Sequence, residues 1–110
     1  MVTHGGPLDA EIVVVGQSPG VEEEARGEPF VGPSGRELRA ALRHVGFDPD
    51  KILYLNAVLC RPEGNATPKI KQINLCRPHL LELLGERKRK LLILAGNEAK
   101  AAVLGGKAAG

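Results

Sequence analysis

The feature that most constrains the fold is the run Glu-Ile-Val-Val-Val-Gly at positions 11–16. Its apolar residues are consecutive rather than alternating, which is typical of a strand buried on both faces. Such strands occur almost only in parallel sheets whose two faces are covered by helices. Similar short runs occupy positions 51–56 and 91–95. We therefore expect a short parallel sheet built from these three segments.

Segments with helical character follow each run. The first opens with a Ser34-x-x-Glu37 capping box, carries apolar residues at i, i+3, i+4 and i+7, and stops at Gly46. The predicted helices cover positions 34–46, 67–85 and 97–105. The order β-α-β-α-β-α predicts a three-layer α/β/α fold, with right-handed crossovers and helices on both faces of the sheet.

Individual residues predict how the last two helices begin and end. Thr67 and Pro68 form a cap and a first-turn proline. Pro78 is expected to break or kink that helix, because it lacks the N–H that a helix interior needs. Asn97 is expected to cap the last helix.

Composition restricts the class of protein. With 110 residues, 43% of them hydrophobic, the chain can form one domain with a modest core, over residues 1–110. The longest apolar stretches have four or five residues, too few for a transmembrane helix, and no signal peptide is visible. We therefore expect a cytoplasmic protein. Its net charge of +2 does not by itself indicate a nucleic-acid partner.

The residues that follow the strands are the candidates for binding, because open parallel sheets bind ligands at the carboxyl ends of their strands. Positions 16–20, Gly-Gln-Ser-Pro-Gly, contain neither a dinucleotide-binding glycine pattern nor a P-loop. Asn56 ends the second strand; it either bonds the backbone or offers a donor and an acceptor to a planar ligand such as a nucleobase. Phe30 is either a loop anchor packed on the core or a stacking platform.

Two cysteines, Cys60 and Cys76, leave two interpretations open. They are either reduced, partly buried thiols or two members of a metal site. A disulfide is disfavoured in a cytosolic protein, and the chain has no C-x-x-C pair.

Basic residues gather in two places. The run Arg-Lys-Arg-Lys at positions 87–90 is expected to be a solvated linker, with phosphate contact as the alternative. Arg61 and Arg77, beside the cysteines, are better placed to touch a nucleic-acid phosphate, or each pairs with a nearby glutamate.

Together these segments resemble the uracil-DNA glycosylase superfamily, and most closely its family 4, the iron–sulfur branch. The resemblance covers about residues 7–106. The segments that carry it are GQSPG at 16–20, GEPFVG at 27–32, LNAVLCRP at 55–62, Gly64-Asn65, Pro68 and Cys76-Arg-Pro78.

The resemblance implies excision of uracil from DNA by hydrolysis of the N-glycosidic bond, after the base is flipped into a pocket. Phe30 would stack on the uracil. Asn56 would accept from N3–H and donate to O4. Gln17, in the loop that holds the attacking water, would be a catalytic and uracil-binding residue. Uracil-containing DNA is the implied partner, and Arg61 and Arg77 are the candidate DNA contacts.

This sequence departs from the family pattern in three respects. Gln17 stands where family 4 carries a glutamate, and the family's His-Pro-Ser motif is absent. The family's [4Fe–4S] cluster takes four cysteines, of which Cys60 and Cys76 would supply two. We therefore expect no bound cluster from a single chain, no cofactor requirement for the chemistry, and a domain incomplete at both ends relative to the family.

Two other functions stay open. One is a shortened, non-catalytic relative that binds DNA or a protein partner, and the other is a small nucleotide-binding α/β domain.

A further expectation concerns association. The strand from Leu91 to Ala95 is expected to lie at the sheet edge, and exposed edges recruit other strands. We therefore expect a homo-oligomer or a partner chain across it.

Overall fold

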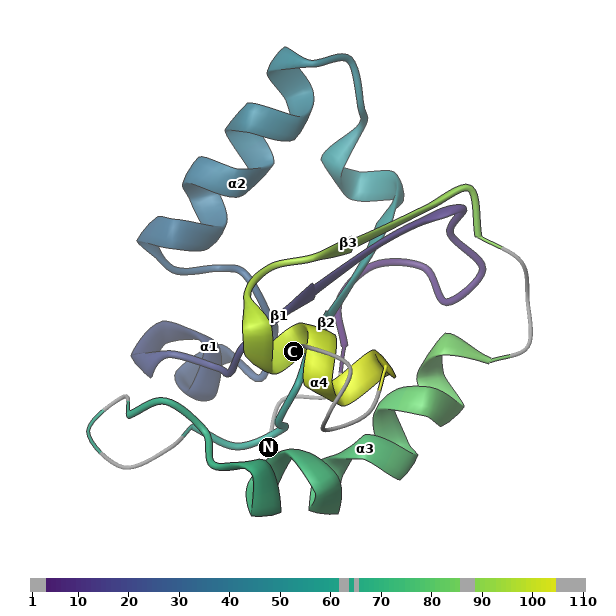
Figure 1. The fold of residues 1–110 in the computed structure, drawn as a ribbon. Helices are drawn as coiled ribbons and strands as arrows, with labels where there is room; N and C mark the ends of the chain where they lie inside the picture. Colours follow the sequence, from purple (N-terminus) through teal and green to yellow (C-terminus); the bar gives the residue numbers. More distant parts are fainter. Residues whose placement is uncertain (1–3, 62–63, 65, 86–88, 105–110) are drawn as a thin grey trace.

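The computed structural model describes residues 4–61, 64, 66–85 and 89–104, in which a parallel sheet of three strands is packed between helices (Figure 1). The predicted alternation of strands and helices is confirmed. In chain order the elements are β1 (Ile12–Gly16), α1 (Val21–Arg26), α2 (Pro33–His44), the 3₁₀ turn η1 (Pro49–Lys51), β2 (Ile52–Asn56), α3 (Ile70–Leu84), β3 (Leu91–Leu94) and α4 (Asn97–Leu104).

The sheet has the order β2-β1-β3, with β1 in the centre. Ile12 lies opposite Ile52 on one side and Leu91 on the other, and both pairings are parallel. The three strands start level with one another, so their carboxyl ends also reach a common edge. The groups that follow them meet at this edge.

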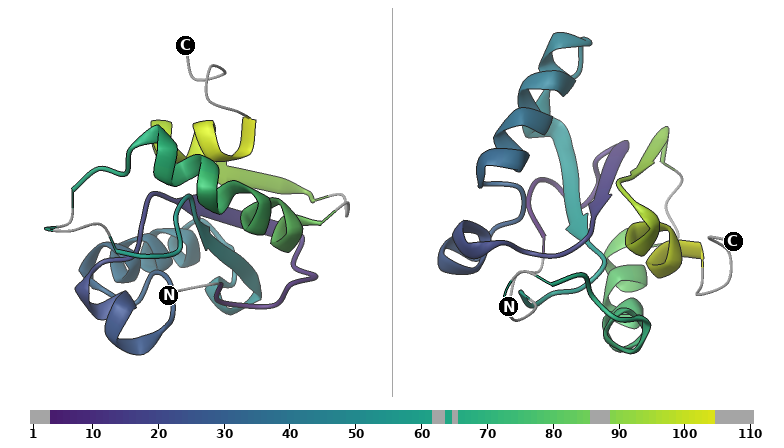
Figure 2. Two further views of the ribbon diagram at one scale, coloured as in Figure 1. Left: turned by 90° about the horizontal axis from the view of Figure 1, so that it is seen from below. Right: turned by 60° about the vertical axis from the view of Figure 1, so that its left-hand side comes forward.

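The predicted three-layer arrangement is confirmed, because each face of the sheet has its own core. Figure 2 shows α2 on one side of the strands and α3 with α4 on the other. The α2 side buries Val14, Leu42, Ile52 and Tyr54. The opposite core takes its buried residues from β1, β2, α3 and α4, and these include Val13, Val15, Leu53, Leu55, Ile73, Leu80, Ala99 and Ala102. In the described part of the chain, no helix is both long and apolar enough to cross a membrane.

Two helix starts differ from the predictions. Gly32 is the N-cap of α2, with Pro33 in its first turn, so the predicted Ser34 cap is wrong. Pro33 favours this earlier start because its fixed φ suits the first helical position. Lys69, not Thr67, precedes α3, where the Gln72 side chain accepts a hydrogen bond from the Lys69 N–H at 2.8 Å.

Two further helix predictions also need correction. Helix α3 continues through Pro78, so the predicted break is wrong, while the alternative, a kink at Pro78, stays a prediction. Helix α1 lies in a segment predicted to be a loop. It has six residues, none of them buried, so no apolar periodicity marks it. Its first turn contains Glu22, Glu23 and Glu24, which suit the positive end of the helix dipole.

The basic run at positions 87–90 includes a residue that contacts the rest of the fold. Positions 87 and 88 lie outside the described residues. Arg89 donates hydrogen bonds to the carbonyl oxygens of Leu8, at 2.9 Å, and Leu84, at 2.8 Å, and also to the carbonyl of Ala10. It therefore fastens the segment before β1 to the end of α3, and the prediction of a solvated linker is wrong for this residue.

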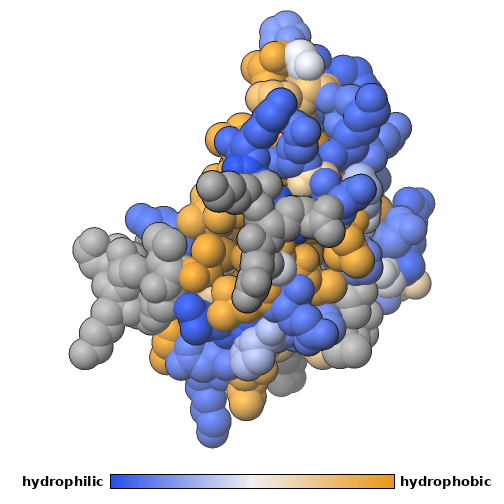
Figure 3. Space-filling model, turned by 90° about the vertical axis from the view of Figure 1, so that its right-hand side faces the viewer, coloured by the Kyte–Doolittle hydropathy of each residue, from blue (hydrophilic) through white to orange (hydrophobic). Residues whose placement is uncertain are grey.

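The burial of β3 differs from that of its neighbours. Val13, Val14 and Val15 of β1 are fully buried, whereas Leu91 and Leu92 are 39% and 37% exposed. Within the described sheet, β3 pairs only with β1, so its outer edge is open. Figure 3 shows a hydrophobic area on the side of the molecule where β3 begins.

We predict that this edge mediates association. Wild-type protein should sediment as a dimer or larger species at tens of micromolar, because pairing would cover the open strand and its apolar side chains. Leu92→Lys should shift it toward monomer, since a charge on an edge strand opposes pairing. Leu75→Lys, at a 74% exposed position of α3, is the control and should change nothing. A stable wild-type monomer at that concentration would contradict the prediction.

Candidate functional site

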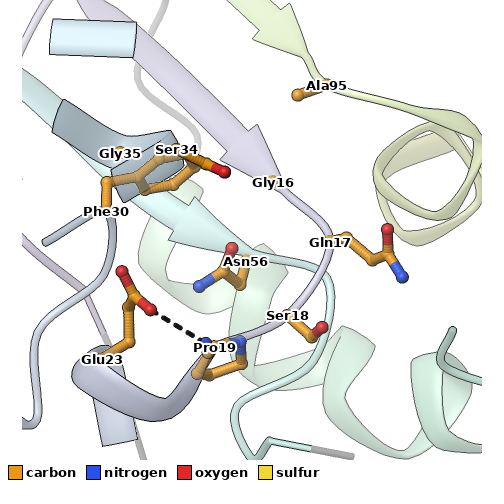
Figure 4. Close-up of a pocket in the computed structure, with 11 residues that line it drawn as sticks. Gly16, Gln17, Ser18, Pro19, Glu23, Phe30, Ser34, Gly35, Asn56 and Ala95 are labelled. Carbon is orange, nitrogen blue, oxygen red and sulfur yellow. Dashed lines mark hydrogen bonds between the residues drawn. The ribbon is translucent and has the colours of Figure 1, made fainter. Parts of the chain in front are cut away.

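A pocket of about 370 Å³ lies at the carboxyl edge of the sheet (Figure 4). Gly16 and Asn56 border it from the ends of β1 and β2, and Ala95 borders it directly after β3. Gln17 and Phe30 also line it. Gln17, Phe30 and Asn56, which the resemblance implies bind uracil, therefore line one pocket, and their roles stay predictions. Ser18, Pro19, Gly20, Glu23, Ser34 and Gly35 complete the lining.

Asn56 is a buried amide without a protein partner. The residue is only 5% exposed, yet its carboxamide makes no hydrogen bond with any described residue. Its amide atoms are not among the described buried side-chain atoms that lack a partner, so they reach the open space of the pocket, where a donor and an acceptor are available to a ligand. The interpretation in which this side chain bonds the backbone is not what the structure shows. Figure 4 shows the carboxamide directed into the space beside Phe30 and Glu23.

Phe30 is held against both the core and the pocket. Its ring centroid lies 5.3 Å from that of Tyr54, so it packs on the core. It also borders the pocket. One side of the ring therefore packs on the core as a loop anchor would, and the other side is available for stacking. A Cβ on Gly16 would lie 2.6 Å from Phe30 Cζ and 2.7 Å from Asn56 Oδ1. Only glycine at position 16 therefore lets the ring and the amide come so close to β1.

Tyr54 gives the ring an uncharged support. Its hydroxyl donates to the Pro49 carbonyl at 2.8 Å, and the Arg39 guanidinium lies 4.2 Å from its ring centroid. Burial raises the pKa of Tyr54, and the nearby Arg39 charge only partly opposes this. The phenol is therefore neutral at physiological pH.

The loop after β1 is pinned to the chain after β2. Ala57 N–H donates to the Gly16 carbonyl at 2.8 Å, and Val58 N–H donates to the Gln17 carbonyl at 3.3 Å. These bonds place the backbone of Gln17 at the pocket. In Figure 4 its side chain extends away from Asn56, toward α4.

Glu23 is a pocket residue that the sequence patterns did not identify. One carboxylate oxygen accepts from Gly20 N–H at 3.0 Å, and the other accepts from Val31 N–H, at 2.9 Å, and from Gly32 N–H. Burial raises the pKa of Glu23, but these backbone hydrogen bonds outweigh it, and the pKa lies below its ordinary value of 4.5. The available signal was the Gly20-x-x-Glu23 spacing, in which a glutamate at N3 reaches back to the N-cap amide.

The two candidate DNA-binding arginines have different surroundings. Arg61 Nε lies 3.8 Å from a carboxylate oxygen of Glu24, which places Arg61 beside α1, although it does not line the pocket. Arg77 Nε donates to the Ala102 carbonyl at 2.9 Å, so it fastens α3 to the last turn of α4. Arg77 is not among the residues that line the pocket. DNA contact by either residue stays a prediction.

The cysteines do not form a complete cluster site. Cys60 is exposed, Cys76 in α3 packs on the core, and both thiols are free. A [4Fe–4S] cluster takes four thiolates, and this sequence contains two cysteines. Within residues 4–61, 64, 66–85 and 89–104, no three or more His, Cys, Asp or Glu side chains gather as metal ligands would. The residues present therefore do not fit a cluster by themselves.

Comparison with known proteins identifies relatives over nearly the whole chain. Residues 3–110 match the uracil DNA glycosylase superfamily. The type-4 uracil-DNA glycosylase of Thermotoga maritima is 35% identical over 107 residues, which are 97% of this chain and 56% of that protein. Those of Pyrobaculum aerophilum and Archaeoglobus fulgidus are 34% and 33% identical, over 83% and 86% of this chain and 46% and 47% of theirs. The chain thus spans about half the length of the curated relatives it matches.

We predict that Glu23 makes stability depend on acid pH. Folding lowers the pKa of Glu23, so its carboxylate stabilises the fold fully at pH values above its ordinary pKa of 4.5. This contribution is lost as the pH falls below 4.5 and through the lower pKa of the folded state. Denaturant unfolding at about pH 6 and about pH 4 should show a smaller difference for Glu23→Gln than for wild type. Equal differences in the two proteins would contradict the prediction.

Proposed function

Because this chain belongs to the uracil-DNA glycosylase superfamily, we propose that its pocket binds uracil flipped out of DNA and that the protein excises the base by hydrolysis, in base excision repair. The observation that carries the proposal is the Asn56 carboxamide, buried at the pocket with its donor and acceptor unused by the described residues. We further propose that residues 1–110 form one domain of this kind and act in the cytoplasm.

The pocket chemistry matches the edge of uracil. In the proposed complex, Asn56 Oδ1 accepts from N3–H of the base and Nδ2 donates to O4. Cytosine presents the opposite order, an acceptor at N3 and a donor at N4, and would leave both groups of the amide unpaired. Phe30 stacks on the base, as aromatic side chains do with unpaired nucleobases.

The proposed reaction is hydrolysis. The bond from N1 of the base to C1′ of the sugar breaks, its electron pair leaves with the base, and the oxygen of water bonds to C1′. The sugar carries positive charge in the transition state, and the base carries negative charge. The Gln17 amide can orient the water, but it cannot take its proton or offset the charge on the sugar. The steps use water and protein groups, and none of them requires a metal cofactor.

We propose Arg61 as a contact to the DNA backbone, since it lies beside α1, the helix that contributes Glu23 to the pocket. A phosphate there would compete with Glu24 for the guanidinium. Arg77 would have to release the carbonyls of α4 to reach a phosphate, so its proposed contribution to DNA binding is the smaller one.

The decisive experiment is a cleavage assay on single- and double-stranded DNA that contains one uracil. Wild-type protein should form abasic sites, and Asn56→Asp should reduce the rate by about 10²-fold or more, because it loses the donor to O4. Asn74→Asp, an exposed position on α3, adds the same charge and should leave the rate unchanged.

Binding of uracil-containing DNA without cleavage would instead support the second candidate, a non-catalytic relative. One observation favours this candidate. Gln17 brings no carboxylate to the pocket, and its side chain is turned away from Asn56 (Figure 4).

We also predict that Gln17→Glu raises any glycosylase activity. A carboxylate near the developing sugar cation supplies electrostatic stabilisation, typically worth roughly 10²–10³ in rate. The double variant Gln17→Glu with Asn56→Asp is the control, and should stay near background because base recognition is impaired. If folded Gln17→Glu shows no gain, the absence of the His-Pro-Ser motif limits the chemistry instead.

A further inference from the structure

Phe30 has a backbone conformation that needs external support. Its φ is +57°, in the left-handed region that bulky side chains rarely adopt. It is the one non-glycine residue with positive φ in the described part of the chain. Because this backbone conformation is unfavourable, the Phe30 ring keeps its position only if contacts with neighbouring residues hold the backbone in place.

The peptide group that joins Phe30 to Val31 is held from both sides by opposite charges. Its carbonyl oxygen accepts from Arg39 Nε at 3.0 Å, and its N–H donates to the Glu23 carboxylate at 2.9 Å. Hydrogen bonds to charged groups are stronger than those between neutral groups. Together they fix the plane of this peptide group and, with it, the direction of the backbone that carries the ring.

Helix α2 packs closely against one side of this peptide group. A Cβ on Gly35 would lie 2.3 Å from both the carbonyl carbon and the oxygen of Phe30, so α2 packs directly on this backbone. On the pocket side, the ring contacts Gly16.

The Glu23 carboxylate also connects the two loops that line the pocket. One oxygen accepts from Gly20, at the end of the loop after β1, and the other accepts from Val31 and Gly32, directly after Phe30. The loop that borders the sugar side of the proposed site and the loop that carries the stacking ring therefore depend on one side chain.

We propose that Glu23 is a positioning residue that, together with Arg39, holds Phe30 in its stacking position before a base enters. This inference rests on the proposed function, because the base concerned is the proposed uracil. Both oxygens of Glu23 are occupied by backbone N–H groups, so it acts through Phe30 and the Gly20 loop. A preformed platform binds its ligand more tightly, because the ordering is complete before binding.

Glu23→Gln tests the proposal with nearly the same shape. One oxygen becomes an NH₂ group, which cannot accept, so at least one of the three backbone N–H groups loses its partner. Glu28→Gln is the matched control. Glu28 is exposed in the segment between α1 and Phe30, and among the described residues it takes part in no hydrogen bond or ion pair.

The first readout needs no ligand. The chain has two phenylalanines, so a ring-labelled sample gives one set of NMR signals for Phe30 and one for Phe47 as an internal reference. In folded Glu23→Gln, the Phe30 signals should shift and average while those of Phe47 stay in place. Glu28→Gln should change neither set. Unchanged Phe30 signals, or equal changes at both rings, would overturn the proposal. If Glu23→Gln does not fold, Arg39→Gln removes the other half of the support and is judged by the same criterion.

The second readout is affinity for a uracil-containing single-stranded oligonucleotide. Glu23→Gln should weaken binding about ten-fold, the effect of losing one hydrogen bond to a charged group, and Glu28→Gln should not. Unchanged affinity with altered Phe30 signals would overturn the role in recognition. If wild-type protein binds no uracil DNA while the Phe30 signals respond as expected, the proposed function fails and the positioning role of Glu23 stands.

Discussion

The structure depends first on the parallel pairing of β1 with both of its neighbours. Val13, Val14 and Val15 have no exposed surface, because strands cover their two edges and helices cover their two faces. The register of both pairings is level, so Gly16, Asn56 and the residue after β3 reach the same edge. A shift of one residue in either pairing would exchange the faces of a strand and remove this alignment. The position of the pocket is therefore a consequence of how the core is filled.

Charged residues make different contacts at the two ends of the sheet. At the amino end, the Arg89 guanidinium donates hydrogen bonds to backbone carbonyls, and Lys90 forms an ion pair with Glu11 at 2.9 Å. At the carboxyl end, the charged groups fix loops, and the buried Asn56 amide stays free. The Asn56 amide faces the pocket at the carboxyl end, and the hydrogen bonds of Arg89 join distant segments at the amino end.

Much of this could be predicted from local pattern. The apolar runs define the strands, and the rule that ligands bind at the carboxyl ends of parallel strands singles out Asn56 and Gln17. What could not be predicted depends on contacts between distant segments. Helix α1 lacks an apolar face, so Glu23 gave no periodic signal, and its role is visible only when residues 20 and 31 lie side by side. Arg89 likewise resembles a solvated cation until the backbone of residues 8–10 is placed beside it.

Gly16 has a consequence for how this pocket can change over evolutionary time. The space above its Cα is shared by the tip of the Phe30 ring and the oxygen of Asn56. Any side chain at position 16 displaces at least one of them, and a smaller residue at position 30 or 56 opens a void that a larger residue at 16 could fill. A substitution at one of the three positions therefore requires compensating substitutions at the others, and their substitutions should be correlated among homologous sequences.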